Sequence, residues 1–157
     1  MALMSALGAA LMLVTSSETL IAASYRNRVE ALYAADAIAE HAIGELGSIA
    51  DWDAVLGGLA RSSFVDGAPA GTRVLADGVT VDLTQAVNMA NCGKATPCSS
   101  ADVLGNATGD RPWAGDNPVW QLFAYGPLGA MLPAGSINTP FYVLAMIADD
   151  PSECDGD

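Results

Sequence analysis

Basic side chains are scarce in this chain of 157 residues. Only 6 Lys and Arg residues stand against 18 acidic residues, which gives a formal net charge of −12. A surface of this charge repels phosphate backbones, so we expect the chain to bind no nucleic acid. The six basic residues are Arg26, Arg28, Arg61, Arg73, Lys94 and Arg111.

Residues and motifs typical of catalytic sites are also few. His41 is the only histidine, and Glu45 follows it one helical turn later. A catalytic or metal-binding histidine needs further partners, and the sequence supplies none nearby, so we expect an ordinary surface or interface histidine. The sequence has no Gly-rich phosphate loop, no nucleophile elbow and no zinc-ligand spacing. We therefore predict no enzymatic activity and no cofactor, apart from the calcium site considered below.

Cysteine is rare as well, with three residues in all. Cys92 and Cys98 bracket a short, turn-rich segment. In an oxidising compartment this spacing predicts a small disulfide loop, whereas a metal site would need more Cys or His nearby. Cys154 is left over. It is either a free thiol or has lost its disulfide partner.

Charge is missing altogether from residues 1–17, which read MALMSALGAALMLVTSS. The apolar stretch resumes at residues 20–23, after Glu18. A membrane-spanning helix needs about 20 apolar residues, so this stretch is slightly short for a span or is tilted. It lacks the basic first region and the cleavage site of a typical secretory signal peptide.

The helical pattern then continues without a break. No proline precedes Pro69, and Gly44 and Gly47 mark where the helix frays or ends. We therefore predict one helix from Met1 to about Leu46, on the order of 70 Å long at roughly 1.5 Å per residue. Apolar residues recur at spacings of three and four, at Tyr25, Val29, Leu32, Ala35, Ala39, Ile43 and Leu46.

Such a helix is too long for the rest of the chain to cover. Half of it has to bury its apolar surface in lipid or against equivalent helices of other copies. A simple membrane anchor with a coiled-coil neck is the alternative, and periodicity alone does not separate the two.

The predicted fold class is α+β, with a helical domain at 1–47 and an acidic, loop-rich head at 48–157. We expect a short helix at 51–59 capped by Asp51, and a hairpin at 72–83. Two runs of aromatic and branched residues predict further strands at 119–125 and 141–147. Together the strands are expected to form a small antiparallel sheet on the C-terminal half of the long helix.

A long loop is expected between about Thr84 and Pro118, because this segment is rich in Asn, Gly, Ala, Thr, Ser and Asp. A loop of this length inside a compact domain is usually functional, or is braced by a staple such as the proposed disulfide.

The end of the chain concentrates five carboxylates in nine residues. Hard oxygen ligands on a turn-rich segment suit calcium, although their spacing does not match an EF-hand loop. A solvated acidic tail is the alternative. The candidate ligands are Asp149, Asp150, Glu153, Asp155 and Asp157.

Two stretches resemble a known family. Residues 17–27 read SETLIAASYRN and residues 31–37 read ALYAADA. Both look like the N-terminal region of PilX-type proteins of type IV pilus assembly, which resemble pilins in having a hydrophobic N-terminal helix that a dedicated peptidase exposes. Residues 111–113, 120–128 and 148–153 are similar to later segments of longer proteins of this type. The resemblance implies a bacterial protein held in the inner membrane before assembly and in an extracellular cell-surface filament afterwards.

Polymerisation through the N-terminal helix follows from this resemblance. Gly8 and the alanines would let neighbouring helices approach closely. If Met1 is the first mature residue, Ser5 stands where most major pilins carry a glutamate, which places ordinary major-pilin assembly in question. The expected filament-core residues are Met1, Leu3, Ser5, Leu7, Gly8, Leu11, Leu13 and Leu20.

Three functions remain open at this stage. The chain is a main structural subunit of the filament, a low-copy minor pilin or pseudopilin that primes or caps it, or a membrane-anchored module whose head binds a ligand. The expected partners are copies of the chain itself and other pilin subunits. A second polypeptide that completes the head is a further candidate, because the family's longer members continue past the region of Asp149, Asp150 and Pro151.

Overall fold

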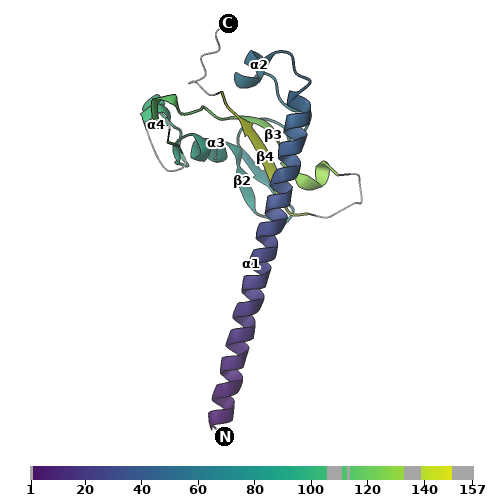
Figure 1. Cartoon of the computed structure of the whole chain (residues 1–157), viewed down its shortest axis with the longest axis vertical. Helices are drawn as coiled ribbons and strands as arrows, with labels where there is room; N and C mark the ends of the chain where they lie inside the picture. Colours follow the sequence, from purple (N-terminus) through teal and green to yellow (C-terminus); the bar gives the residue numbers. More distant parts are fainter. Residues whose placement is uncertain (1, 106–110, 113, 133–138, 150–157) are drawn as a thin grey trace. The chain divides into compact units, whose positions relative to one another are not determined.

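The computed structural model describes residues 2–105, 111–112, 114–132 and 139–149, and the side chains of these residues except 2–11, 13 and 114. The chain divides into two compact units, Met1–Asp36 and Ala37–Asp157. It combines a long N-terminal helix with small antiparallel sheets (Figure 1). This confirms the α+β class at a coarse level.

The first element, α1, is a single helix over Ala2–Leu46 (Figure 1). It ends at the predicted place, where the Gly47 N–H donates to Ile43 O at 3.1 Å. In its last turns Ile38 and Ala42 are buried, at 3% and 5% exposed, whereas Ile43 is 69% exposed. The face that the second unit buries is therefore not the face that carries the larger residues of the predicted apolar stripe.

The short helix α2, Trp52–Leu56, has the predicted cap. The Asp51 side chain accepts a hydrogen bond from the Ala54 N–H at 3.0 Å, which satisfies a backbone donor of the first turn. The helix is shorter than predicted because two glycines follow it, and Gly58 has a φ of 70°.

The predicted hairpin is present. Strands β1, Thr72–Val74, and β2, Thr80–Asp82, pair antiparallel, with Val74 opposite Thr80. The Gly78 N–H donates to Leu75 O at 2.9 Å, and Gly78 has a φ of 82° that favours glycine.

The two strands predicted from aromatic and branched residues are also present. Strand β3, Gln121–Pro127, pairs antiparallel with β4, Tyr142–Ile147. A short 3₁₀ turn, η2, follows β3 at Leu128–Ala130. Leu122 and Tyr125 of β3 are buried with Leu83 in the core. The prediction of one sheet was wrong in part, because in the described residues β1–β2 and β3–β4 form separate sheets.

An extended segment that sequence reasoning missed runs along the other edge of β3. Ser62 N–H donates to Phe123 O at 3.0 Å, and Tyr125 N–H donates to Phe64 O at 3.0 Å. Val65 and Tyr125 form a parallel bridge. Residues 62–66 thus act as a third strand beside β3, so that β3 has hydrogen-bonded backbone on both sides.

The predicted long loop at 84–118 is wrong. The segment contains α3, Leu83–Cys92, and α4, Ser100–Gly105, and a 3₁₀ turn, η1, follows at Ala114–Asp116. The α3 helix begins because Asp82 accepts from the Gln85 N–H at 3.0 Å, and it ends at Gly93, whose φ is 69°.

Tertiary hydrogen bonds fasten the end of α3 to the start of β3. The buried Asn91 amide accepts from the Trp120 N–H at 2.7 Å and donates to Trp120 O at 3.1 Å. The buried Arg111 guanidinium donates to Ala90 O and Pro118 O. Burial lowers the pKa of Arg111, because a charge in the interior is poorly solvated.

The predicted disulfide joins Cys92 and Cys98, whose Cα atoms are 6.1 Å apart. It links the last residue of α3 to the loop before α4. Its closed loop is short, since the two residues are 6 apart in sequence, and so the expected stabilisation is modest.

Removing this disulfide is expected to lower the free energy of unfolding by about 2 kcal/mol, since a loop of this size restricts the unfolded chain only moderately. Urea unfolding with and without reductant, in a Cys154→Ser background, measures the effect. The Cys92→Ala/Cys98→Ala variant is the control and should no longer respond to reductant. A response that persists in this variant would mean that the disulfide is not the reductant-sensitive element.

Candidate functional site

The helix of the first unit exposes large apolar side chains. Leu20 is 72% exposed, Ile21 68% and Tyr25 71%. Exposed apolar area of this extent on a single helix is costly in water, at roughly 25 cal/mol per Å². Others lie before and after these three, namely Met12, Val14, Leu32 and Tyr33.

The same part of α1 also carries charge. Arg26 and Glu30, which are four residues apart on the helix, pair with each other at 2.6 Å. Glu18 and Arg28 are exposed, and neither forms an ion pair within the described part of the chain. Isolated charges are costly in hydrocarbon.

A hollow of about 340 Å³ lies on this helix surface. It is lined by Leu20, Ile21, Ser24, Tyr25 and Arg28. All five residues come from little more than two turns of α1, so the hollow is a feature of the surface of this one helix.

Of the predicted filament-core residues, Leu20 is the one whose side chain the structure describes, and it is exposed. The others lie outside the described side chains: Met1, Leu3, Ser5, Leu7, Gly8, Leu11 and Leu13. Among the residues that were described, no helix is both long and apolar enough to cross a membrane.

The structure describes only one of the predicted calcium ligands. Asp149 is exposed, whereas Asp150, Glu153, Asp155 and Asp157 lie outside the described residues, as does Cys154. Within residues 2–105, 111–112, 114–132 and 139–149, no group of three or more His, Cys, Asp or Glu side chains is placed to hold a metal ion. The calcium site therefore stays a prediction.

His41 takes part in a contact at the end of α1. Its ring packs edge-on against Phe64 with centroids 5.9 Å apart, and its Nε2 atom lies 3.4 Å from Ser62 Oγ and 3.5 Å from Glu45 Oε2. Glu45 Oε1 in turn accepts from the Ser63 N–H at 3.1 Å. These contacts tie the last turns of α1 to the segment that runs beside β3.

The pKa of the Glu45 carboxyl is lowered. Burial acts in the opposite direction, but hydrogen bonds from Ser62 and Ser63, helped by the nearby His41, outweigh it. A lowered folded pKa means that this stabilisation is present above the unfolded value of about 4.5 and is lost as the pH falls through the folded pKa.

We expect Glu45→Gln to lower the free energy of unfolding by about 1 kcal/mol at neutral pH, because it removes a charge-assisted acceptor. The difference from the wild type should begin to shrink below about pH 4.5, where the unfolded carboxylate takes up a proton, and should shrink further as the pH falls through the lowered folded pKa. Urea titrations followed by tryptophan fluorescence at several pH values measure it. A difference that stays constant down to about pH 3 would contradict the assignment to Glu45.

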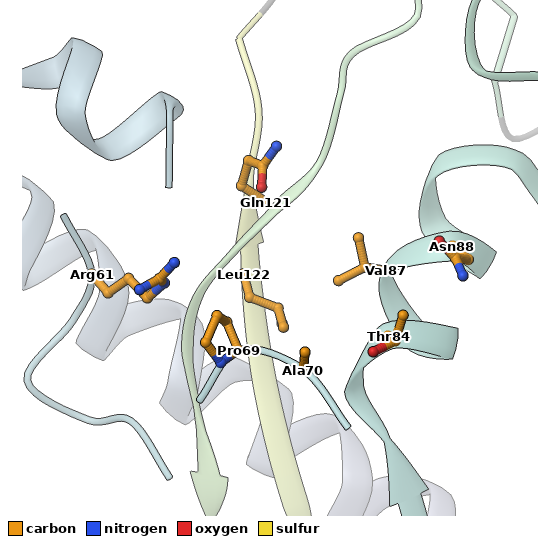
Figure 2. Close-up of a pocket in the computed structure, with 8 residues that line it drawn as sticks. All are labelled: Arg61, Pro69, Ala70, Thr84, Val87, Asn88, Gln121 and Leu122. Atoms are coloured by element: carbon orange, nitrogen blue, oxygen red, sulfur yellow. The ribbon is translucent and has the colours of Figure 1, made fainter. Parts of the chain in front are cut away.

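The second unit has a small, half-open pocket of about 170 Å³. Figure 2 shows Arg61 on one side, Thr84 and Asn88 of α3 on the other, and Gln121 of β3 between them. Its apolar lining comes from Pro69, Ala70, Val87 and Leu122. The volume is below the roughly 300–1,000 Å³ of drug-sized ligand sites, so the pocket fits a small group only.

Arg61 gives this pocket its charge. It is exposed and makes no ion pair within the described part of the chain, in contrast to Arg73, which lies 3.5 Å from Asp66. Sequence reasoning missed the pocket because its lining comes from four separate segments that no spacing rule connects.

Comparisons of the chain with protein families, with characterised proteins and with solved structures found no match.

Proposed function

We propose that the chain is a structural subunit of a type IV pilus-like extracellular filament, held in the inner membrane before assembly and polymerising through its N-terminal helix. The observation that carries the proposal is the exposure of Leu20, Ile21 and Tyr25 on one helix. A helix that is apolar on several faces is normally buried, and in a filament the equivalent helices of neighbouring copies bury it.

The charges on α1 favour protein neighbours over lipid around residues 18–30. Glu18, Arg26, Arg28 and Glu30 are spread over about three turns of the helix, among the exposed apolar residues. Lipid would penalise each isolated charge, whereas a neighbouring copy can pair it. The resemblance of residues 17–37 to PilX-type proteins agrees with this interpretation.

Electron cryo-microscopy of filaments sheared from the source cells, with mass spectrometry of the same fraction, tests the proposal. We expect helical density into which this sequence fits at every repeat. A trace amount in the filament fraction would instead favour the low-copy priming or capping subunit. Absence from filaments would contradict both.

A second candidate, a membrane-anchored module that binds a ligand, is favoured by the pocket around Arg61. A small organic anion suits its single cation and amide groups. Replacing residues 1–24 with an unrelated spanning helix separates the two functions. A plain anchor keeps its activity after this exchange, whereas a filament subunit loses assembly because its helix contacts are specific.

A further inference from the structure

A regular seam runs along the exposed helix. Six positions at alternating spacings of four and three lie on one face of α1, as in helices that pack along a shared stripe. They are Val14, Glu18, Ile21, Tyr25, Arg28 and Leu32, all exposed. Four are apolar, and the two charges are of opposite sign.

The two charges of the seam are available to a partner. Neither Glu18 nor Arg28 forms an ion pair within the described part of the chain, whereas Arg26 and Glu30, off the seam, already pair at 2.6 Å. The seam is therefore self-complementary, because it offers one acid and one base to a second copy of itself.

The hollow on α1 lies on this seam. Its lining residues Ile21, Ser24, Tyr25 and Arg28 occupy positions i, i+3, i+4 and i+7. Four residues in this relation form the hole that receives one side chain of a facing helix.

We propose that neighbouring copies pack these seams in parallel, displaced by about 15 Å along the helix axis, with Glu18 of one copy paired to Arg28 of the next. This displacement corresponds to about ten to eleven residues at 1.5 Å each. It brings Val14 of one copy to the hollow of its neighbour and Ile21 beside the neighbour's Leu32. The charge pair thereby sets the axial stagger.

An antiparallel pair centred near residue 23 would also join Glu18 to Arg28. Such a pair is two-fold symmetric and closed, since both charges of each copy are used within one dimer. In the parallel arrangement each copy gives Glu18 to one neighbour and Arg28 to another, so the contact repeats without closing. The choice of the parallel arrangement rests on the proposed filament function.

Charge reversal in the full-length chain tests the pairing. Glu18→Arg and Arg28→Glu, made singly, place like charges together and should raise the concentration needed for half-maximal polymerisation about tenfold or more. The double reversal should bring it back near the wild-type value. The matched control, Arg26→Glu with Glu30→Arg, reverses a pair within one helix and should leave it unchanged. Circular dichroism checks that each variant keeps its helix.

Cross-linking tests the direction. In a Cys154→Ser background, oxidation of Glu18→Cys/Arg28→Cys should give a ladder of trimers and larger products, since the parallel contact is open. Dimers alone would show the antiparallel pair and overturn the proposed stagger. If the wild type polymerises and the single reversals polymerise equally well, the charge pairing is wrong while the filament function stands. If the wild-type chain does not polymerise even under the conditions in which the source cells make filaments, the proposed filament function itself is wrong.

Discussion

Replacing Leu20 by glutamate is expected to abolish polymerisation of the full-length chain while leaving the second unit folded. Leu20 is 72% exposed in the single chain, so the substitution costs the isolated molecule little. In the proposed filament the same position is expected to be buried against a neighbour, where an unpaired carboxylate would cost several kcal/mol at each contact. Because every copy carries the change, the loss repeats along the whole polymer.

Sedimentation and electron microscopy of the full-length protein measure this effect, and near-UV circular dichroism reports on the second unit. Leu20→Met is the first control, since it keeps the volume and the apolar character and should polymerise. Asn27→Glu is the second, because it adds the same charge two turns later at a position that is already polar, and it should weaken assembly far less. Equal polymerisation of Leu20→Glu and wild type would exclude this part of the helix from any interface.

Several elements could be predicted from the sequence because local signals determine them. The end of α1 follows from Gly47, the start of α2 from the Asp51 cap, and the hairpin turn from Gly78. Strands β3 and β4 were found because aromatic and branched residues dominate both. The disulfide followed from spacing, since only Cys92 and Cys98 lie close together in sequence.

Helix α3 was missed because its stability comes from tertiary contacts. Its residues 83–92 include Thr, Gln and two Asn, most of which are weak helix formers. The helix is held by the Asp82 cap at one end, and at the other by the hydrogen bonds of Asn91 and Arg111 to backbone groups near β3. No short window of sequence contains both Asn91 and Trp120, or both Arg111 and Ala90, which these long-range bonds join.

The seam of α1, in contrast to α3, is a local pattern in the sequence. Its spacing can be read from the sequence, and Tyr25 and Leu32 belong to the predicted apolar stripe. At spacings of three and four the sequence offers neither Glu18 nor Arg28 an oppositely charged residue, so it already predicts that neither pairs along the helix. The structure distinguishes the paired Arg26 and Glu30 from these two residues.

The second large effect is expected at Gly126, near the C-terminal end of β3. Gly126 lies opposite Val143, and a Cβ atom added to it would lie 2.8 Å from Phe64 Cζ and within 3.3 Å of two further ring atoms. Glycine in a strand often marks such a close approach of a neighbour. The ring of Phe64 thus occupies the space that a side chain at position 126 would fill.

We expect Gly126→Ala to lower the free energy of unfolding by about 2 kcal/mol, and Gly126→Val by about 3 kcal/mol. The ring has to move, and it also packs edge-on against His41 with centroids 5.9 Å apart. Relief of one contact therefore disturbs the other, and with it the tie between the end of α1 and residues 62–66. Urea unfolding followed by tryptophan fluorescence measures both values.

A double-mutant cycle separates this clash from an ordinary loss of strand propensity. In a Phe64→Leu background the ring is absent, so Gly126→Ala should cost less than about 1 kcal/mol, and the coupling between the two changes should exceed about 1 kcal/mol. Gly115→Ala is the matched control, because no atom lies within 4 Å of the added Cβ, and it should be nearly neutral. If Gly126→Ala costs the same in both backgrounds, the cost comes from the strand backbone, and Phe64 does not require a glycine at this position.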